Sequence, residues 1–125
     1  MKKLIHTDRA PKAIGPYSQA IEINGMLFIS GQIAIDPATG KLIDGGIREQ
    51  TERVLTSIGE ILKQAGYDYS DVVKSTCLLS DINDFAAMNE VYSRFYLDVR
   101  PARAAFAARA LPLGALVEIE TIAVK

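Results

Sequence analysis

The chain has 125 residues, of which 49% are hydrophobic and 23% are charged. This length fits one domain and leaves no room for a second, and this composition is not that of a disordered or fibrous chain. Fourteen Lys and Arg against fifteen Asp and Glu give a net charge of −1, whereas proteins that bind nucleic acid through its phosphates usually carry a basic excess. We therefore expect a single domain over residues 1–125 and no nucleic-acid partner.

The cysteine count and the lengths of the apolar runs indicate where the protein is located and whether it binds a metal. Cys77 is the only cysteine, so it cannot form an intramolecular disulfide, and one Cys with one His supplies no metal-binding cluster. No apolar stretch of signal-peptide length precedes Asp8, and no apolar run elsewhere approaches membrane-spanning length. We expect a soluble, cytoplasmic protein with no membrane contact and no bound metal.

The first expected elements form a hairpin. Residues 20–23 and 26–30 read as strands, and Asn24-Gly25 between them supplies the positive φ angles of a tight two-residue turn. The pairs Asp-Pro, Thr-Gly and Gly-Gly then mark residues 33–46 as a loop with one tight turn.

Two helices follow, with a strand between them. Apolar residues at helical spacing from Ile47 onward predict a helix that ends at Gly66, and residues 71–79 read as a strand. Asn83 or Asp84 can cap a second helix, which Pro101 prevents from continuing.

The last two strands complete an α+β pattern. We expect strands over residues 103–109 and 116–124, joined across 111–114, in a mixed sheet with two helices on one face. In residues 104–108 neither alternating set is polar, so both faces of the sheet should be covered there. We expect other copies of the chain to cover the second face; the alternative is a helix tail or loop of the same chain.

Arg103 is the first candidate for chemistry. It precedes five apolar residues at the start of a strand, so its charge should lie at the edge of a buried region and need an anion. The planar guanidinium suits a carboxylate bound through two hydrogen bonds. That carboxylate is either a substrate or a structural Asp or Glu, and the sequence alone does not choose between them.

Other candidates carry weaker signals. Glu118 and Glu120 should leave the same face of the last strand, either as a solvent-facing edge or with one partly buried carboxylate that shuttles protons or positions water. Tyr17 follows a rigid turn, and the run 30–32 ends a strand where backbone N–H groups could be unpaired; either could be simple turn chemistry. Asn89 is a weak candidate, because an Asn within a helix is usually solvated.

Seven runs of the chain together resemble the Rid family, also called the YjgF family. The resemblance points in particular to the reactive-intermediate/imine deaminase A (RidA) subgroup, because the arginine is present. It spans nearly the whole chain, through residues 13–20 (AIGPYSQA), 29–33 (ISGQI), 71–76 (DVVKST), 83–85 (NDF), 89–92 (NEVY), 101–105 (PARAA) and 118–120 (EIE).

The resemblance implies a chorismate-mutase-like fold and a homotrimer, in which three sheets form a central barrel and three active sites lie between subunits. It implies that Arg103 clamps the substrate carboxylate, that Glu118 handles the water or the proton, and that Tyr17 lines the cleft from the neighbouring subunit. Substrate contacts would be completed by Ser30, Gly31, Asn89, Ala104 and Ala105. Many relatives carry cysteine where this chain has Ala105, which excludes a thiol role here while backbone contacts survive.

The activity implied is hydrolysis of small 2-imino acids, such as 2-iminobutanoate and 2-iminopropanoate, to 2-oxo acids and ammonia without a cofactor. One alternative is a trimeric module that binds or senses 2-oxo acids without turning them over. A further alternative, an endoribonuclease or translation inhibitor, is disfavoured by the neutral charge balance.

Overall fold

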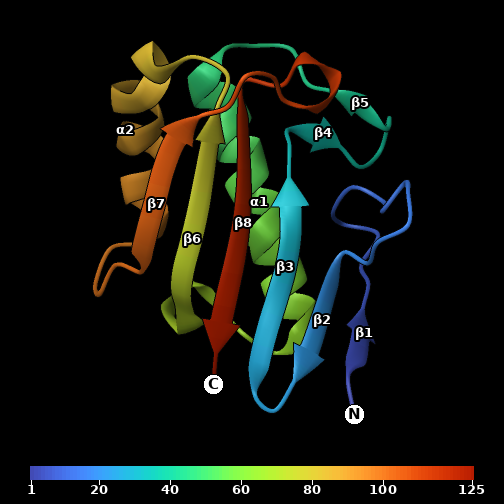
Figure 1. The fold of residues 1–125 in the computed structure, drawn as a ribbon. Coiled ribbons are helices and arrows are strands. Elements are labelled where there is room, and N and C mark those ends of the chain that lie inside the picture. Colours follow the sequence, from blue (N-terminus) through green and yellow to red (C-terminus); the bar gives the residue numbers. More distant parts are fainter.

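The computed structural model describes residues 1–125 as two layers, a six-stranded sheet with both helices on one of its faces (Figure 1). The helices are α1 (Ile47–Ala65) and α2 (Phe85–Phe95). In spatial order the strands are β1 (Lys3–Ile5), β2 (Ala20–Ile23), β3 (Met26–Gln32), β8 (Val117–Val124), β6 (Val72–Leu79) and β7 (Ala102–Ala107). Only β6 and β7 pair in parallel, so the sheet is mixed and the expected α+β class is confirmed.

The hairpin predicted from Asn24-Gly25 is confirmed. Strands β2 and β3 pair antiparallel from Ala20 opposite Ile29 to Ile23 opposite Met26. Asn24 has φ of 51° and Gly25 φ of 74°, the left-handed values that such a turn demands.

Helix α1 is also as predicted. It ends at Gly66, whose φ of 83° allows its N–H to bond back to the last turn. At the other end, the N–H of Gly46 donates to Oε1 of Glu49 at 2.7 Å. The buried side of α1, which includes Val54, Ile58 and Ile61, packs into a cluster of 21 buried residues between the helices and the sheet. Neither helix combines the length and the apolar character that crossing a membrane requires.

Three details of the prediction were wrong. Strand β1 was not foreseen, because its few residues carry no clear alternation. The expected loop 33–46 contains a small hairpin of its own, β4 (Ile35–Asp36) and β5 (Lys41–Leu42). Asp84 is the residue before α2, as expected, but its side chain makes no capping hydrogen bond; Asp81 caps the preceding 3₁₀ turn, accepting from the N–H of Asn83 at 2.9 Å.

The sheet face away from the helices is open, as the front of Figure 1 shows. Phe106 on β7 is 50% exposed and Phe28 on β3 is 38% exposed, and both project from this face. The alternative that a helix tail or loop of the same chain covers the face is therefore wrong.

The turn at Gly25 generates a stability prediction with a matched control. A β-carbon at position 25 would lie 2.7 Å from the carbonyl oxygen of Lys125, whereas one at Gly40, with nearly the same φ, would meet nothing within 4 Å. Gly40→Ala should cost about 1 kcal/mol for the left-handed backbone alone. Gly25→Ala should cost about 2–3 kcal/mol because the steric overlap is added. Urea unfolding of both variants measures the difference, and equal losses would contradict the steric argument.

Candidate functional site

Arg103 lies on the helix side of the sheet, held by side chains of α2. Its Nη1 donates to Oδ1 of Asn89 at 2.8 Å. Its guanidinium carbon lies 4.9 Å from the ring centroid of Tyr92 and 5.4 Å from that of Phe85, within range of cation–π attraction. Arg103 takes part in none of the salt bridges of the chain. Within one copy of the chain, therefore, no structural Asp or Glu neutralises Arg103, and its charge is available to an anion from outside that copy.

Asn89 is more important here than its sequence suggested. Its place within a helix makes it a weak candidate in the sequence, but it is half-buried and accepts a hydrogen bond from Arg103. The signal was available, because Phe85, Asn89 and Tyr92 recur at the spacing of one helix face. A neutral amide orients the guanidinium without neutralising it, so the full positive charge stays beside a cavity of about 420 Å³ that Asn89, Tyr92 and Arg103 help to line.

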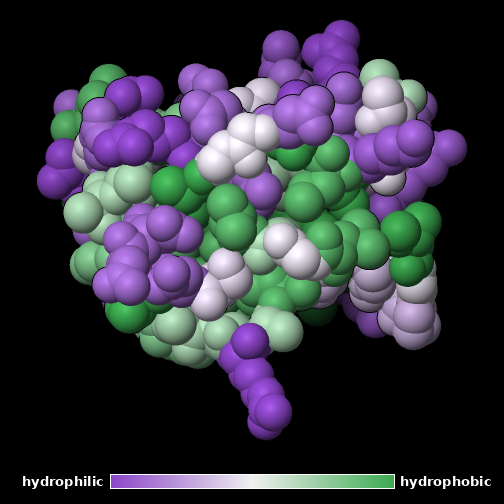
Figure 2. Space-filling view, turned by 90° about the horizontal axis from the view of Figure 1, so that it is seen from above, coloured by the Kyte–Doolittle hydropathy of each residue, from purple (hydrophilic) through white to green (hydrophobic).

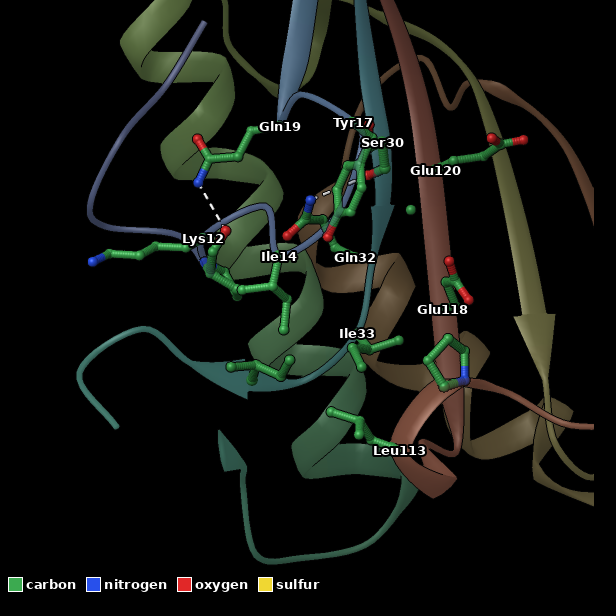
Figure 3. Close-up of a pocket in the computed structure, with 14 residues that line it drawn as sticks. Lys12, Ile14, Tyr17, Gln19, Ser30, Gln32, Ile33, Leu113, Glu118 and Glu120 are labelled. Carbon is green, nitrogen blue, oxygen red and sulfur yellow. Dashed lines mark hydrogen bonds between the residues drawn. The ribbon is translucent and has the colours of Figure 1, made fainter. Parts of the chain in front are cut away.

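A larger cavity of about 620 Å³ opens near the end of β3 (Figure 3). It brings together four of the expected site residues, Tyr17, Ser30, Gly31 and Glu118, along with Glu120. Part of its wall is apolar, through Ile14, Ile33, Ile35, Pro112 and Leu113. Viewed from this end, the molecule has an apolar area with hydrophilic side chains along its margins (Figure 2).

A β-bulge in β3 shapes this cavity. Ile29 lies opposite Thr121 and Gln32 opposite Ile119, so β3 advances three residues while β8 advances two. The extra residue falls in the Ser30–Gly31 pair, and such bulges commonly adjoin functional sites because they redirect side chains.

Ser30 corrects one expectation. Its N–H, one of those that could be unpaired at the end of this strand, donates to the carbonyl of Gln19 at 2.9 Å, and its hydroxyl donates to the carbonyl of Ser18 at 2.6 Å. Both donors of Ser30 are therefore engaged within the chain. They tie β3 to the segment that carries Tyr17, which is half-exposed at the cavity.

Gln19 also holds this segment and was missed by the sequence analysis. The buried Oε1 of Gln19 accepts from the N–H of Thr7 at 2.8 Å, while Nε2 donates to the carbonyls of Thr7 at 3.0 Å and Pro11 at 2.8 Å. These contacts close the irregular loop between β1 and β2, so no periodic pattern could have revealed them.

Glu118 and Glu120 leave the same face of β8, as predicted, but their surroundings differ. Glu118 is half-buried and Glu120 is exposed, and in Figure 3 the Glu120 carboxylate points away from Tyr17. Burial, and after it the negative charge of Glu120, raises the pKa of Glu118. Of the two alternatives, the solvent-facing edge describes Glu120 and the partly buried carboxylate describes Glu118. A raised pKa lets Glu118 hold a proton at a higher pH than an ordinary carboxyl does.

Within one copy of the chain, Arg103 and Glu118 do not meet. Arg103 is in register with Ser75, which is in register with Thr121, whereas Glu118 is in register with Leu78, three residues further along β6. Two strand spacings of about 4.8 Å and three residues of about 3.4 Å place the two Cα atoms on the order of 14 Å apart. Alternation along the strands also puts the two side chains on opposite faces of the sheet.

The remaining candidates are placed as follows. Ala104 is exposed on the open face, and Ala105 is half-buried on the helix side. Both belong to β7, an edge strand, whose outer backbone groups have no strand partner. Cys77 is fully buried, and His6 is exposed beside Asp8. No group of three or more His, Cys, Asp or Glu side chains is arranged to bind a metal ion.

Cys77 gives a test of the buried layer. Burial raises the pKa of its thiol to about 11 from the ordinary 9.0, which leaves about 100-fold less thiolate at pH 8. Native protein should therefore react with a disulfide reagent such as dithiodipyridine at least about 100-fold more slowly than protein unfolded in urea. Comparable rates in the two states would contradict the buried position.

Comparisons with known proteins agree with this architecture. The family model described as Endoribonuclease L-PSP matches residues 7–125. The chain is 53% identical over 125 residues to 2-iminobutanoate/2-iminopropanoate deaminase of Bos taurus, covering 100% of this chain and 91% of that protein.

Two solved structures superpose closely. The Rid family protein YyfA of Yersinia pestis has a TM-score of 0.97 at 46% identity and covers 100% of both chains. The structure of E. coli TdcF with bound serine has a TM-score of 0.94 at 39% identity and covers 98% of both chains. The match of sequence and fold over nearly the full length shows that this chain belongs to the Endoribonuclease L-PSP family, which is the Rid (YjgF) family that its motifs resemble.

Proposed function

We propose that this protein is a 2-iminobutanoate/2-iminopropanoate deaminase, which hydrolyses small 2-imino acids to 2-oxo acids and ammonia without a cofactor. The observation that carries the proposal is the Arg103 guanidinium, held by a neutral amide and two rings and free of any carboxylate partner. The deaminase name of the 53% identical bovine relative supports the activity. The serine in E. coli TdcF supports a ligand with a carboxylate and a nitrogen on one carbon.

The proposed reaction needs orientation and proton transfer and little else. Arg103 binds the substrate carboxylate through two parallel hydrogen bonds and fixes the imine carbon. Glu118 removes a proton from water as the water adds to that carbon and passes it to the nitrogen, which gives a carbinolamine. Glu118 then takes the proton of the new hydroxyl and passes it to the same nitrogen, so that the C–N bond breaks, the C=O bond forms and ammonia leaves. The C=N bond is replaced by C=O, water is consumed, and no electrons are exchanged. The raised pKa of Glu118, caused by burial and by the charge of Glu120, suits a group that must both accept and return a proton.

We further propose that the site is completed between copies of the chain in a homotrimer. Arg103 and Glu118 lie on opposite faces of one sheet, so a single copy does not present both to one substrate. The open apolar face supports the same arrangement, because packing three such faces into a central barrel removes Phe28 and Phe106 from water. Tyr17 then lines the cleft from the same copy as Glu118.

The activity is tested with imines generated in place by an amino-acid oxidase or a dehydratase. Arg103→Ala should lower kcat/KM for imine hydrolysis by at least about 100-fold, since two charge-assisted hydrogen bonds of about 1.5 kcal/mol or more each are lost. Arg94→Ala serves as the control, because Arg94 lies on α2 and pairs only with Glu90 at the surface. Full activity of a folded Arg103→Ala variant, or saturable binding of 2-oxo acids with no turnover, would refute the deaminase.

A mixing experiment tests the shared site. Arg103→Ala and Glu118→Gln proteins should each be inactive, but subunit exchange at equal amounts should restore about a quarter of the wild-type sites, each with one intact arginine and one intact glutamate from neighbours. Mixed oligomers that assemble and stay inactive would place both residues of a site in the same copy.

A further inference from the structure

Gly31 is a glycine that its own backbone does not require. Gly25, Gly40 and Gly66 have φ in the left-handed region, where a side chain is strained, but Gly31 does not. A residue with a side chain could adopt the Gly31 backbone without strain. The reason for glycine at this position must therefore lie in the space around it.

That space is occupied by the carboxylate of Glu118. A β-carbon added to Gly31 would overlap Oε2 of Glu118 and lie 3.0 Å from its Cδ and 3.3 Å from its Cγ. The approach follows from the bulge, which adds one residue to β3 between the positions paired with Thr121 and Ile119. The carboxylate thus rests directly against the backbone of β3.

We propose that Gly31 is a positioning residue for hydrolysis, because its missing side chain leaves the recess that seats the Glu118 carboxylate against β3. The inference rests on the proposed deaminase function, in which Glu118 transfers the protons. It assigns Gly31 a steric role on the carboxylate, separate from any backbone contact that Gly31 makes to substrate.

Filling the recess should affect the position of the Glu118 carboxylate more than the stability of the fold. The group that a methyl at position 31 would displace is the far end of a flexible side chain, which can rotate to another staggered conformation and leave the fold intact. Catalysis is more sensitive, because a displacement of about 1 Å of a reacting group can cost about 100-fold in rate.

The recess also affects the proton affinity of Glu118. The charged or titratable side chains that share its cavity are Glu120, Lys12 and Tyr17, and the three atoms nearest to a β-carbon at position 31 all belong to Glu118 instead. Lys12 points to the opposite side of the cavity from both carboxylates (Figure 3). Moving Glu118 out of the recess exposes it to water, which weakens the desolvation that raises its pKa. The pKa of Glu118 should then fall toward that of an ordinary carboxyl.

The test compares Gly31→Ala in two backgrounds. In the wild-type background it should lower kcat/KM for imine hydrolysis at least about 10-fold, mainly through kcat, because Arg103 still binds the substrate. In the Glu118→Asp background it should cost less than about 3-fold, since the shorter side chain clears the added methyl. Gly46→Ala is the control; its β-carbon would meet only Oε1 of Glu49 at 3.6 Å. An equal loss in both backgrounds, or no loss in either, would overturn the proposal.

A second measurement does not depend on turnover. Titration of the Glu118 carboxyl by ¹³C NMR should give a lower midpoint in Gly31→Ala than in wild type, with urea unfolding showing that both proteins are folded. An unchanged midpoint of Glu118 in Gly31→Ala would refute the proposal that Gly31 seats the carboxylate, whether or not the protein hydrolyses imines. A different result would refute the deaminase and support the recess: wild-type protein does not hydrolyse imines, but the midpoint of Glu118 is still lower in Gly31→Ala than in wild type.

Discussion

The contact between Arg103 and the face of α2 is the interaction on which the site depends. A guanidinium at a half-buried position normally requires a carboxylate, which would cancel its charge. Asn89 supplies an oxygen without a charge, and the rings of Phe85 and Tyr92 supply attraction of about 0.5–2 kcal/mol each. The arginine is thereby oriented and kept electrostatically free, which is what a receptor for a small organic acid needs.

The sheet then determines how this cation can act. Because side chains alternate across a strand, Arg103 shares the helix side with Asn89 while Glu118 and Glu120 project from the open face. The same alternation leaves Phe28 and Phe106 exposed. The assembly that we propose would remove the apolar face from water and would also bring a carboxylate of one copy to an arginine of another. Association and catalysis would then be coupled through one surface.

The bulge in β3 links the two ends of the larger cavity. Ser30 anchors the segment that carries Tyr17, while its neighbour Gly31 admits the Glu118 carboxylate. One additional residue in a strand thus sets the position of a phenol and of a carboxylate that are about a hundred residues apart in the chain. Gln19 holds the remainder of that segment from behind.

The sequence by itself determined the α+β class, the Asn24-Gly25 hairpin, helix α1 and the shared face of Glu118 and Glu120, because each follows from local turn chemistry or from a short period. It also singled out Arg103, through a charge beside an apolar run. Only the tertiary structure decided that Asn89 orients this arginine, that both donors of Ser30 bond to backbone carbonyls of the same chain, and that Glu118 lies against Gly31. These contacts join segments that are distant in the sequence, and they depend on a register shift and on the face from which each side chain projects. None of these features produces a periodic pattern in the sequence.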